Sequence, residues 1–193
     1  MSRILFAILI AVGARSVFAE RYLTIPEVQA LCFAQADRFE TQDLRPTAEQ
    51  TAAIEKLSSV KIPKRPYRLW IARQGKTVLG VLIIDQVFTK HDLVDYAVAL
   101  SPAGRILQVE ILEYREKFGS DIRSPKWLAQ FAGKTAASPL TLNEDIYNIS
   151  GATISCRHVT EGVKRVLAAC QTVALPRLRA AGELPDAEAS KPR

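Results

Sequence analysis

The chain has 193 residues, of which 48% are hydrophobic and 24% are charged, so it can bury one full hydrophobic core. This composition excludes a chain that is intrinsically disordered throughout. The formal net charge is +6, but the Lys and Arg residues are scattered rather than gathered in one basic run. We therefore expect no nucleic-acid partner.

The first 19 residues have the features of a secretory signal peptide. Arg3 precedes an apolar run over residues 4–14, and Val17-Phe18-Ala19 resembles a cleavage site. The run is shorter than the roughly 20 residues that a membrane-spanning helix needs. We therefore expect residues 1–19 to be removed and the protein to be exported, to the periplasm or elsewhere outside the cytoplasm. An uncleaved anchor is the alternative.

Three cysteines matter in an exported protein, because disulfides persist outside the cytoplasm. Cys156 and Cys170 fall on one predicted helix and would lie about 21 Å apart, too far to form a disulfide. Two possibilities stay open: a bond from Cys32 to one of them, or three free thiols.

Residues 20–66 are predicted to form a helical N-terminal segment. Thr24 followed by Pro26 and Glu27 is typical of a capped helix start, and this helix is expected to run to about Arg38. Thr47 with Gln50 predicts the start of a second helix, which the stretch "SSVKIPKRP" ends.

Four strand-like runs follow: "YRLWIA", "KTVLGVLIIDQVF", "LVDYAVAL" and "RILQVEILEY". The links between them are short, which favours an antiparallel meander. Gly75 and Gly104 are expected to take the positive-φ positions of the turns.

Helical patterns return after the strands. Ser124, Pro125 and Gly133 mark the start and the stop of a short lid helix. A long amphipathic helix begins near Ser155, and the polar residues 176–193 are expected to be a disordered tail. The predicted fold class is α+β: an antiparallel sheet meander flanked by N-terminal helices, a short lid helix and a C-terminal helix, with the main domain at 67–175.

The stretch "NISGATISCRH" just before the last helix is a candidate anion site. The first amides of a helix lack intrahelical acceptors and carry a partial positive charge, so phosphate binds there. Gly151 and the hydroxyls of Ser150, Thr153 and Ser155 suit a phosphate seat, and Arg157 adds a fixed charge. A simple capped turn is the alternative.

"SGATIS" before an amphipathic helix resembles the attachment motif of the bacterial FMN-binding domain family. This family includes flavin subunits of the sodium-translocating NADH:quinone reductase and of the Rnf complex, and the flavin domain of the nitrous-oxide-reductase regulatory protein. A second stretch, "EYREKFGSDIRSPKWLAQFAGK", resembles the family's upstream loop and short aromatic helix, with Glu116 and Gly119 in the loop. Together the resemblance covers roughly residues 67–175.

The resemblance implies that the Thr153 hydroxyl bonds covalently to the phosphate of FMN. It places the phosphate near Ser150, Gly151, Ala152, Ser155 and Arg157, and the flavin ring toward the loop of Glu116 and Gly119. The family commonly has Asp three positions before the motif serine, where this chain has Tyr147, and often has His where this chain has Tyr114. Covalent attachment is the prediction, and a non-covalent FMN site stays open.

The resemblance further implies an electron carrier rather than a stand-alone enzyme. Its partners would be redox proteins, either a cytochrome or a membrane electron-transfer complex, which would place it close to a membrane. Attachment would need a magnesium-dependent flavin transferase that uses FAD. The alternatives are a flavin-dependent reductase of a small substrate and an exported binding module without covalent flavin.

No catalytic or metal site is predicted from the remaining residues. The two histidines, His91 and His158, and the three dispersed cysteines do not have the spacing of metal ligands. Cys156 and His158 stand two positions apart on a helix and point in different directions, which disfavours a thiol and base pair.

Overall fold

The computed structural model describes residues 20–115 and 119–185 and contains one six-stranded antiparallel sheet. The strand order is β1-β6-β5-β4-β3-β2. The strands are β1 (Glu20–Arg21), β2 (Arg38–Leu44), β3 (Tyr67–Gln74), β4 (Thr77–Phe88), β5 (Leu93–Leu100) and β6 (Ile106–Tyr114). The predicted α+β class and the antiparallel meander are therefore confirmed.

The helical elements lie before, between and after the strands. They are α1 (Ile25–Cys32), α2 (Ala48–Ser58), the 3-10 helix η1 (Ser120–Arg123), α3 (Pro125–Leu128), the 3-10 helix η2 (Ala129–Phe131), α4 (Thr153–Ala169), the π-helix η3 (Cys170–Ala174) and α5 (Leu175–Ala180). None of the helices in the described ranges is long and apolar enough to cross a membrane.

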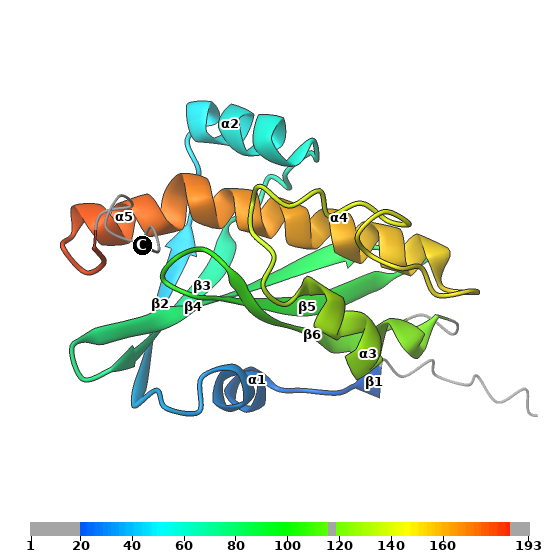
Figure 1. Ribbon diagram of the computed structural model, residues 1–193, viewed down its shortest axis with the longest axis horizontal. Coiled ribbons are helices and arrows are strands. Elements are labelled where there is room, and N and C mark those ends of the chain that lie inside the picture. Colours follow the sequence, from blue (N-terminus) through cyan, green and yellow to red (C-terminus); the bar gives the residue numbers. More distant parts are fainter. Residues whose placement is uncertain (1–19, 116–118, 186–193) are drawn as a thin grey trace, which may run out of the picture.

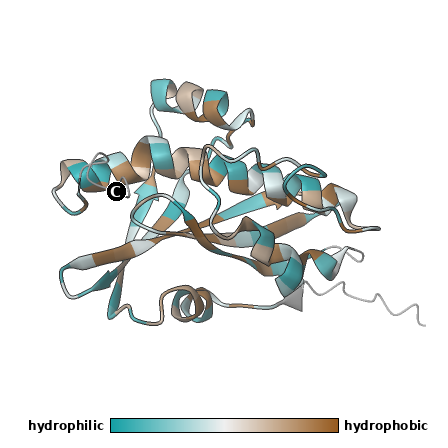
Figure 2. Cartoon of the chain, in the orientation of Figure 1, coloured by the Kyte–Doolittle hydropathy of each residue, from teal (hydrophilic) through white to brown (hydrophobic). Residues whose placement is uncertain are grey.

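The sheet separates two apolar layers. Figure 1 shows α4 lying along one face of the sheet, with α2 packed on the outer side of α4, while α1 lies against the opposite face. The larger core fills the α4 side, and a smaller cluster around Val28, Phe33 and Trp70 fills the α1 side. Hydrophobic residues accordingly run along the central strands in Figure 2.

The turns of the meander agree with the glycine positions in the sequence. Gly75 joins β3 to β4 at φ +58°, and Gly104 precedes β6 at φ +76°. Both are backbone conformations that favour glycine, so these two turn predictions are confirmed.

Two sequence predictions for the N-terminal segment need correction. Helix α1 ends at Cys32 rather than near Arg38, and residues Arg38–Leu44 form the edge strand β2, which pairs with β3. This segment is therefore not wholly helical. Most β2 side chains are exposed or only partly buried, so the strand lacks the alternating apolar pattern by which strands are found.

The C-terminal boundary also needs correction. The chain stays helical beyond Pro176 to the end of α5 at Ala180, whereas a disordered tail was expected from residue 176. Leu175, Leu178 and Leu184 are buried in the main core, and Glu183 forms an ion pair with Arg73 of β3. This packing holds the segment in place. Residues 186–193 lie outside the described residues, as does the predicted signal peptide at 1–19.

The three cysteines are free thiols on two sides of the sheet. Cys32 belongs to the α1 layer, whereas Cys156 and Cys170 are buried in the α4 layer. Burial raises the pKa of Cys32 and of Cys170 to about 12 and also raises the pKa of Cys156. A thiol with a raised pKa stays neutral and is a poor nucleophile, which disfavours a role in covalent catalysis for any of the three.

Gly162 allows α4 to approach the sheet closely. A Cβ atom at this position would lie 2.3 Å from the Tyr96 hydroxyl oxygen and 2.8 Å from Val87 Cγ1. Tyr96 is fully buried and its hydroxyl donates to Asp85 at 2.8 Å, so it cannot move away without breaking that bond. Glycine here sets the distance between helix and sheet.

A Gly162→Ala variant is therefore expected to be less stable, although alanine is the better helix former. The steric cost, about 1–3 kcal/mol, exceeds the roughly 1 kcal/mol gain in helix propensity. Thermal unfolding followed by circular dichroism measures the difference. Glu161→Ala, at the exposed neighbouring position, is the matched control, and an unchanged or raised Tm for Gly162→Ala would contradict the packing argument.

Candidate functional site

The predicted anion site coincides with the start of α4. The helix begins at Thr153, two residues before the predicted start, and its N-cap is Ala152, which makes no side-chain capping bond. The first-turn amides of such a helix are left to solvent or to a ligand. Gly151 has φ +83° with open space around it. Glycine is therefore favoured here by the backbone conformation of the turn and not by a close contact.

The Thr153 hydroxyl lies at this helix end and is held by a side chain that the sequence analysis missed. Asn148 Nδ2 donates a hydrogen bond of 2.9 Å to Thr153 Oγ1. Thr153 and Asn148 are both partly buried, and Asn148 Oδ1 is buried with no hydrogen-bond partner in the described structure. The sequence shows an asparagine five positions before Thr153, but this spacing does not predict the contact. Only the loop geometry brings the two side chains together.

The other predicted seat residues point in different directions. Ser150 and Arg157 are exposed, whereas Ser155 is buried with its hydroxyl 3.2 Å from the Tyr114 hydroxyl. Ser155 therefore faces the sheet, and only its backbone belongs to the helix end. Ala152 is also buried and packs in the main core.

The two predicted motifs meet in the structure at Gly119. A Cβ atom at this glycine would lie 2.7 Å from the Tyr114 hydroxyl oxygen, 3.4 Å from Ser155 Oγ and 3.5 Å from Ala152 Cβ. Gly119 has φ +87° and is the N-cap of η1. Gly119 of the upstream motif therefore lies beside the start of α4, while Glu116 lies outside the described residues.

A Gly119→Ala variant is expected to lose stability at this junction. The positive φ costs a non-glycine residue about 1–2 kcal/mol, and the clash with Tyr114 adds to that cost and disturbs the bond to Ser155. Denaturant unfolding measures the loss. Gly133→Ala is the matched control, because Gly133 has φ +80° and open space around it; equal losses in both variants would mean that the close contact at Gly119 contributes nothing.

The short helix after the sheet anchors the loop that carries the motif. Trp127 Nε1 donates to the Tyr147 carbonyl oxygen at 2.8 Å, and the Tyr147 amide donates to Gln130 Oε1 at 2.6 Å. The Tyr147 side chain itself is 76% exposed. Tyr147, which stands where the family commonly has Asp, therefore holds the loop through its backbone, and its phenol points away from the core.

Lys134, which follows the short helix, holds the same loop from its other end. Its ammonium group lies 2.7 Å from Asp145 Oδ2, and Asp145 also accepts bonds from the amides of Leu140 and Thr141. Burial alone would raise the pKa of Asp145, but these hydrogen bonds outweigh it and hold the pKa below its ordinary value. The aromatic helix with its Gly-Lys stop is thus a support for the loop.

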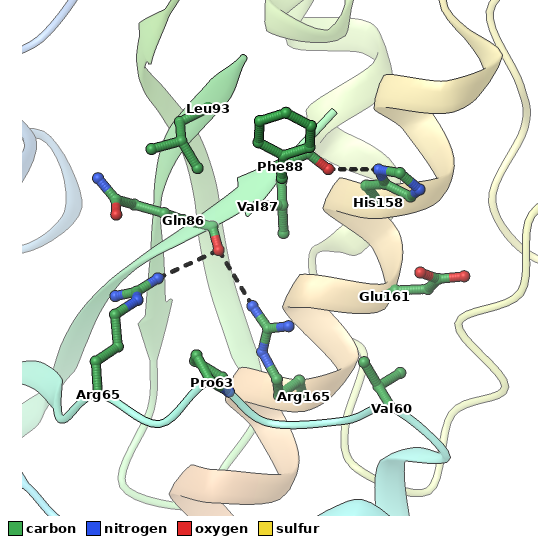
Figure 3. Close-up of a pocket in the computed structure, with 10 residues that line it drawn as sticks. All are labelled: Val60, Pro63, Arg65, Gln86, Val87, Phe88, Leu93, His158, Glu161 and Arg165. Atoms are coloured by element: carbon green, nitrogen blue, oxygen red, sulfur yellow. Dashed lines mark hydrogen bonds between the residues drawn. The ribbon is translucent and has the colours of Figure 1, made fainter. Parts of the chain in front are cut away.

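A pocket of about 400 Å³ lies farther along α4, between this helix, the end of β4 and residues 60–65. Figure 3 shows Arg65 and Arg165 converging on the Gln86 carbonyl oxygen, and His158 bonded to the Phe88 carbonyl oxygen. Since a carbonyl only accepts, His158 Nδ1 is the donor. Both arginines also bind the buried carboxylate of Asp85, which ties α4 to the sheet.

The described side chains include no group of three or more His, Cys, Asp and Glu residues that could hold a metal ion. The features that stand out are instead an uncapped helix start, a held threonine hydroxyl and a supported loop. They define an α+β domain suited to hold a phosphate-bearing cofactor at the start of α4.

Comparison with known proteins agrees with the predicted resemblance. Residues 90–168 match the model of the FMN-binding domain family, and this match indicates FMN as the cofactor. The matched range runs from the β4–β5 turn through α3 and most of α4. It is narrower than the predicted range of 67–175.

The crystal structure of Shewanella oneidensis NqrC has a similar fold. The TM-score is 0.54 and the identity 17%, over 77% of this chain and 86% of the NqrC chain. At this identity the likeness concerns the fold alone. Comparison with curated proteins gives no match.

Proposed function

We propose that this chain is an exported electron-transfer flavoprotein that carries FMN as a phosphoester on Thr153. One observation carries the proposal: the Thr153 hydroxyl lies at the uncapped start of α4, inside an FMN-binding domain, and is held by Asn148. A hydroxyl in this position is next to the helix amides that attract phosphate.

The residues around Thr153 fit a phosphate group. The first-turn amides of α4 supply donors. Arg157 is exposed and lies beside residues 140–143, so it adds positive charge to this end of α4 without a contact to Thr153 in the described structure. Gly151 leaves open space at the turn, so nothing there obstructs a ligand. These residues would hold and orient the phosphate.

The attachment step proposed here is a phosphoryl transfer from FAD. The Thr153 oxygen forms a bond to the flavin-side phosphorus, the P–O bond within the pyrophosphate breaks, and AMP leaves. The hydroxyl proton passes to a base of the transferase. No electron is gained or lost, and the bond from Asn148 leaves the hydroxyl proton free for removal.

The proposed role of the attached cofactor is to carry electrons between proteins. FMN supplies one- and two-electron chemistry when bound, while the protein supplies holding and orientation. The described residues form one sheet domain, which suits a carrier that passes electrons to a cytochrome or to a membrane electron-transfer complex. A covalent bond suits an exported carrier, because lost FMN is not easily replaced outside the cytoplasm.

The test is the intact mass of the protein, made with and without a flavin transferase and then denatured. The expected result is a chain cleaved after Ala19 that carries the mass of one FMN only when the transferase is present. A flavin that leaves on denaturation would overturn the covalent assignment, and a colourless protein would favour the binding module. An uncleaved chain would overturn export through this signal.

A further inference from the structure

We infer that Asn148 is a positioning residue of the flavin site: its amide nitrogen fixes the Thr153 hydroxyl, and its carbonyl oxygen accepts a hydrogen bond from the ribityl chain of FMN. The inference rests on the proposed attachment at Thr153. It goes beyond that proposal by giving a role to a residue outside the "SGATIS" motif.

Two atoms of one side chain carry the inference. Asn148 Nδ2 donates to Thr153 Oγ1 at 2.9 Å, which fixes the direction of the threonine oxygen. Asn148 Oδ1 is buried and has no donor among the described residues. A buried carbonyl oxygen without a donor is unfavourable, so this atom is suited to a donor that arrives with a ligand.

The chemistry of the cofactor decides which group that donor is. A phosphodiester at neutral pH has only acceptor oxygens, so it cannot satisfy Asn148 Oδ1. The ribityl hydroxyls next to the phosphate are donors. The Asn148 amide can bond to both groups: its nitrogen donates to the Thr153 oxygen, and its oxygen accepts from a ribityl hydroxyl.

The backbone around Asn148 is fixed on both sides, so its side chain is oriented in advance. Tyr147 is held by Trp127 and Gln130, and the Ile149 carbonyl oxygen accepts a bond from the Ala152 amide. The Tyr147 phenol points outward, so it does not take part. Asn148 is thus the polar side chain that the loop holds against Thr153.

The test compares Asn148→Leu and Asn148→Asp with the wild type. Attachment rates are measured with purified transferase and FAD by in-gel flavin fluorescence, and the anisotropy of flavin fluorescence is measured in the loaded proteins. Both variants are expected to load about tenfold more slowly and to hold the flavin more loosely, as for the loss of one or two hydrogen bonds. Asn143→Asp makes the same chemical change at an exposed site and is expected to match the wild type.

A pH series separates hydrogen bonding from a merely structural role. Below the ordinary carboxyl pKa of about 4, the carboxyl group introduced by Asn148→Asp becomes a neutral donor and acceptor, and this variant should regain high anisotropy. Asn148→Leu should not. Wild-type loading and anisotropy in Asn148→Leu, or no recovery of Asn148→Asp in acid, would overturn the inference. Equal covalent flavin in the wild type and in Thr153→Ala would instead overturn the proposed function.

Discussion

A Thr153→Ala variant is expected to carry no covalent flavin when it is made together with a flavin transferase. Alanine has no oxygen that could form the phosphoester bond, and the neighbouring motif hydroxyls lie elsewhere. Ser150 lies in the turn before the helix and is exposed, whereas the Ser155 hydroxyl is turned toward Tyr114. Intact mass after denaturation measures the loss, which should be complete.

The fold of this variant should survive, so the loss can be assigned to the chemistry. Thr153 is only partly buried, and its side-chain hydrogen bond is the one from Asn148, so its removal costs about 1 kcal/mol. Thr153→Ser keeps the hydroxyl and is expected to be loaded. Covalent flavin in Thr153→Ala at the wild-type level would show that the phosphoester lies on another residue.

Much of the sheet could be predicted from the sequence because its central strands are buried. The strands β3 to β6 have apolar runs of the expected length, and glycines at 75 and 104 mark their turns. β2 has no such signal. It is held by main-chain pairing with β3 along an edge whose side chains are largely exposed, so its stability comes from a neighbour rather than from its own pattern.

The two helix ends that differ from prediction have a related cause. Pro176 is normally a reason to end a helix, but it falls in the first turn of α5, just after the π-helix η3, where its missing N–H matters least. Leu175 and Leu178 then bury the continuation. Tertiary packing decides the boundary, and the polar composition after residue 176 gave no sign of it.

The candidate site likewise has a part that the sequence predicts and a part that it does not. Thr153 and Gly151 could be predicted because they belong to a contiguous motif at a helix start. The contacts of Gly119 with Tyr114 and of Asn148 with Thr153 depend on how two loops fold over the end of the sheet, and spacing alone cannot give them. The resemblance predicted that the upstream loop lies near the helix start, and in the structure Gly119 does lie beside Ser155 and Ala152.

Replacing Asp85 with alanine is expected to have the largest effect on stability. Asp85 is fully buried and accepts hydrogen bonds from Arg65, Arg165 and the Tyr96 hydroxyl at 2.6, 2.5 and 2.8 Å. Burial raises the pKa of Tyr96 well above its ordinary value, so its hydroxyl remains a donor. Removing the carboxylate leaves a buried guanidinium and a buried hydroxyl without their partner, at a cost of about 3–5 kcal/mol.

Thermal unfolding should show this loss as a fall in Tm of about 10 °C or more. Asp43→Ala is the matched control, because Asp43 pairs with Arg45 on the surface, where an ion pair contributes at most about 1 kcal/mol. A double variant with Asp85→Leu and Arg165→Leu removes both buried charges and should be less destabilised than the sum of the two single changes.

The Asp85 variant also connects the core to the flavin site. Arg165 lies on α4, the helix that begins at Thr153, so the ion pair fixes this helix against β4. A loosened α4 should place the Thr153 hydroxyl less uniformly and slow flavin loading even below the melting temperature. Asp85→Ala and Asp43→Ala are compared in their Tm and in their rate of flavin loading. Equal values in the two variants would mean that the close packing at Gly162, and not the buried charges, holds α4 in place on the sheet.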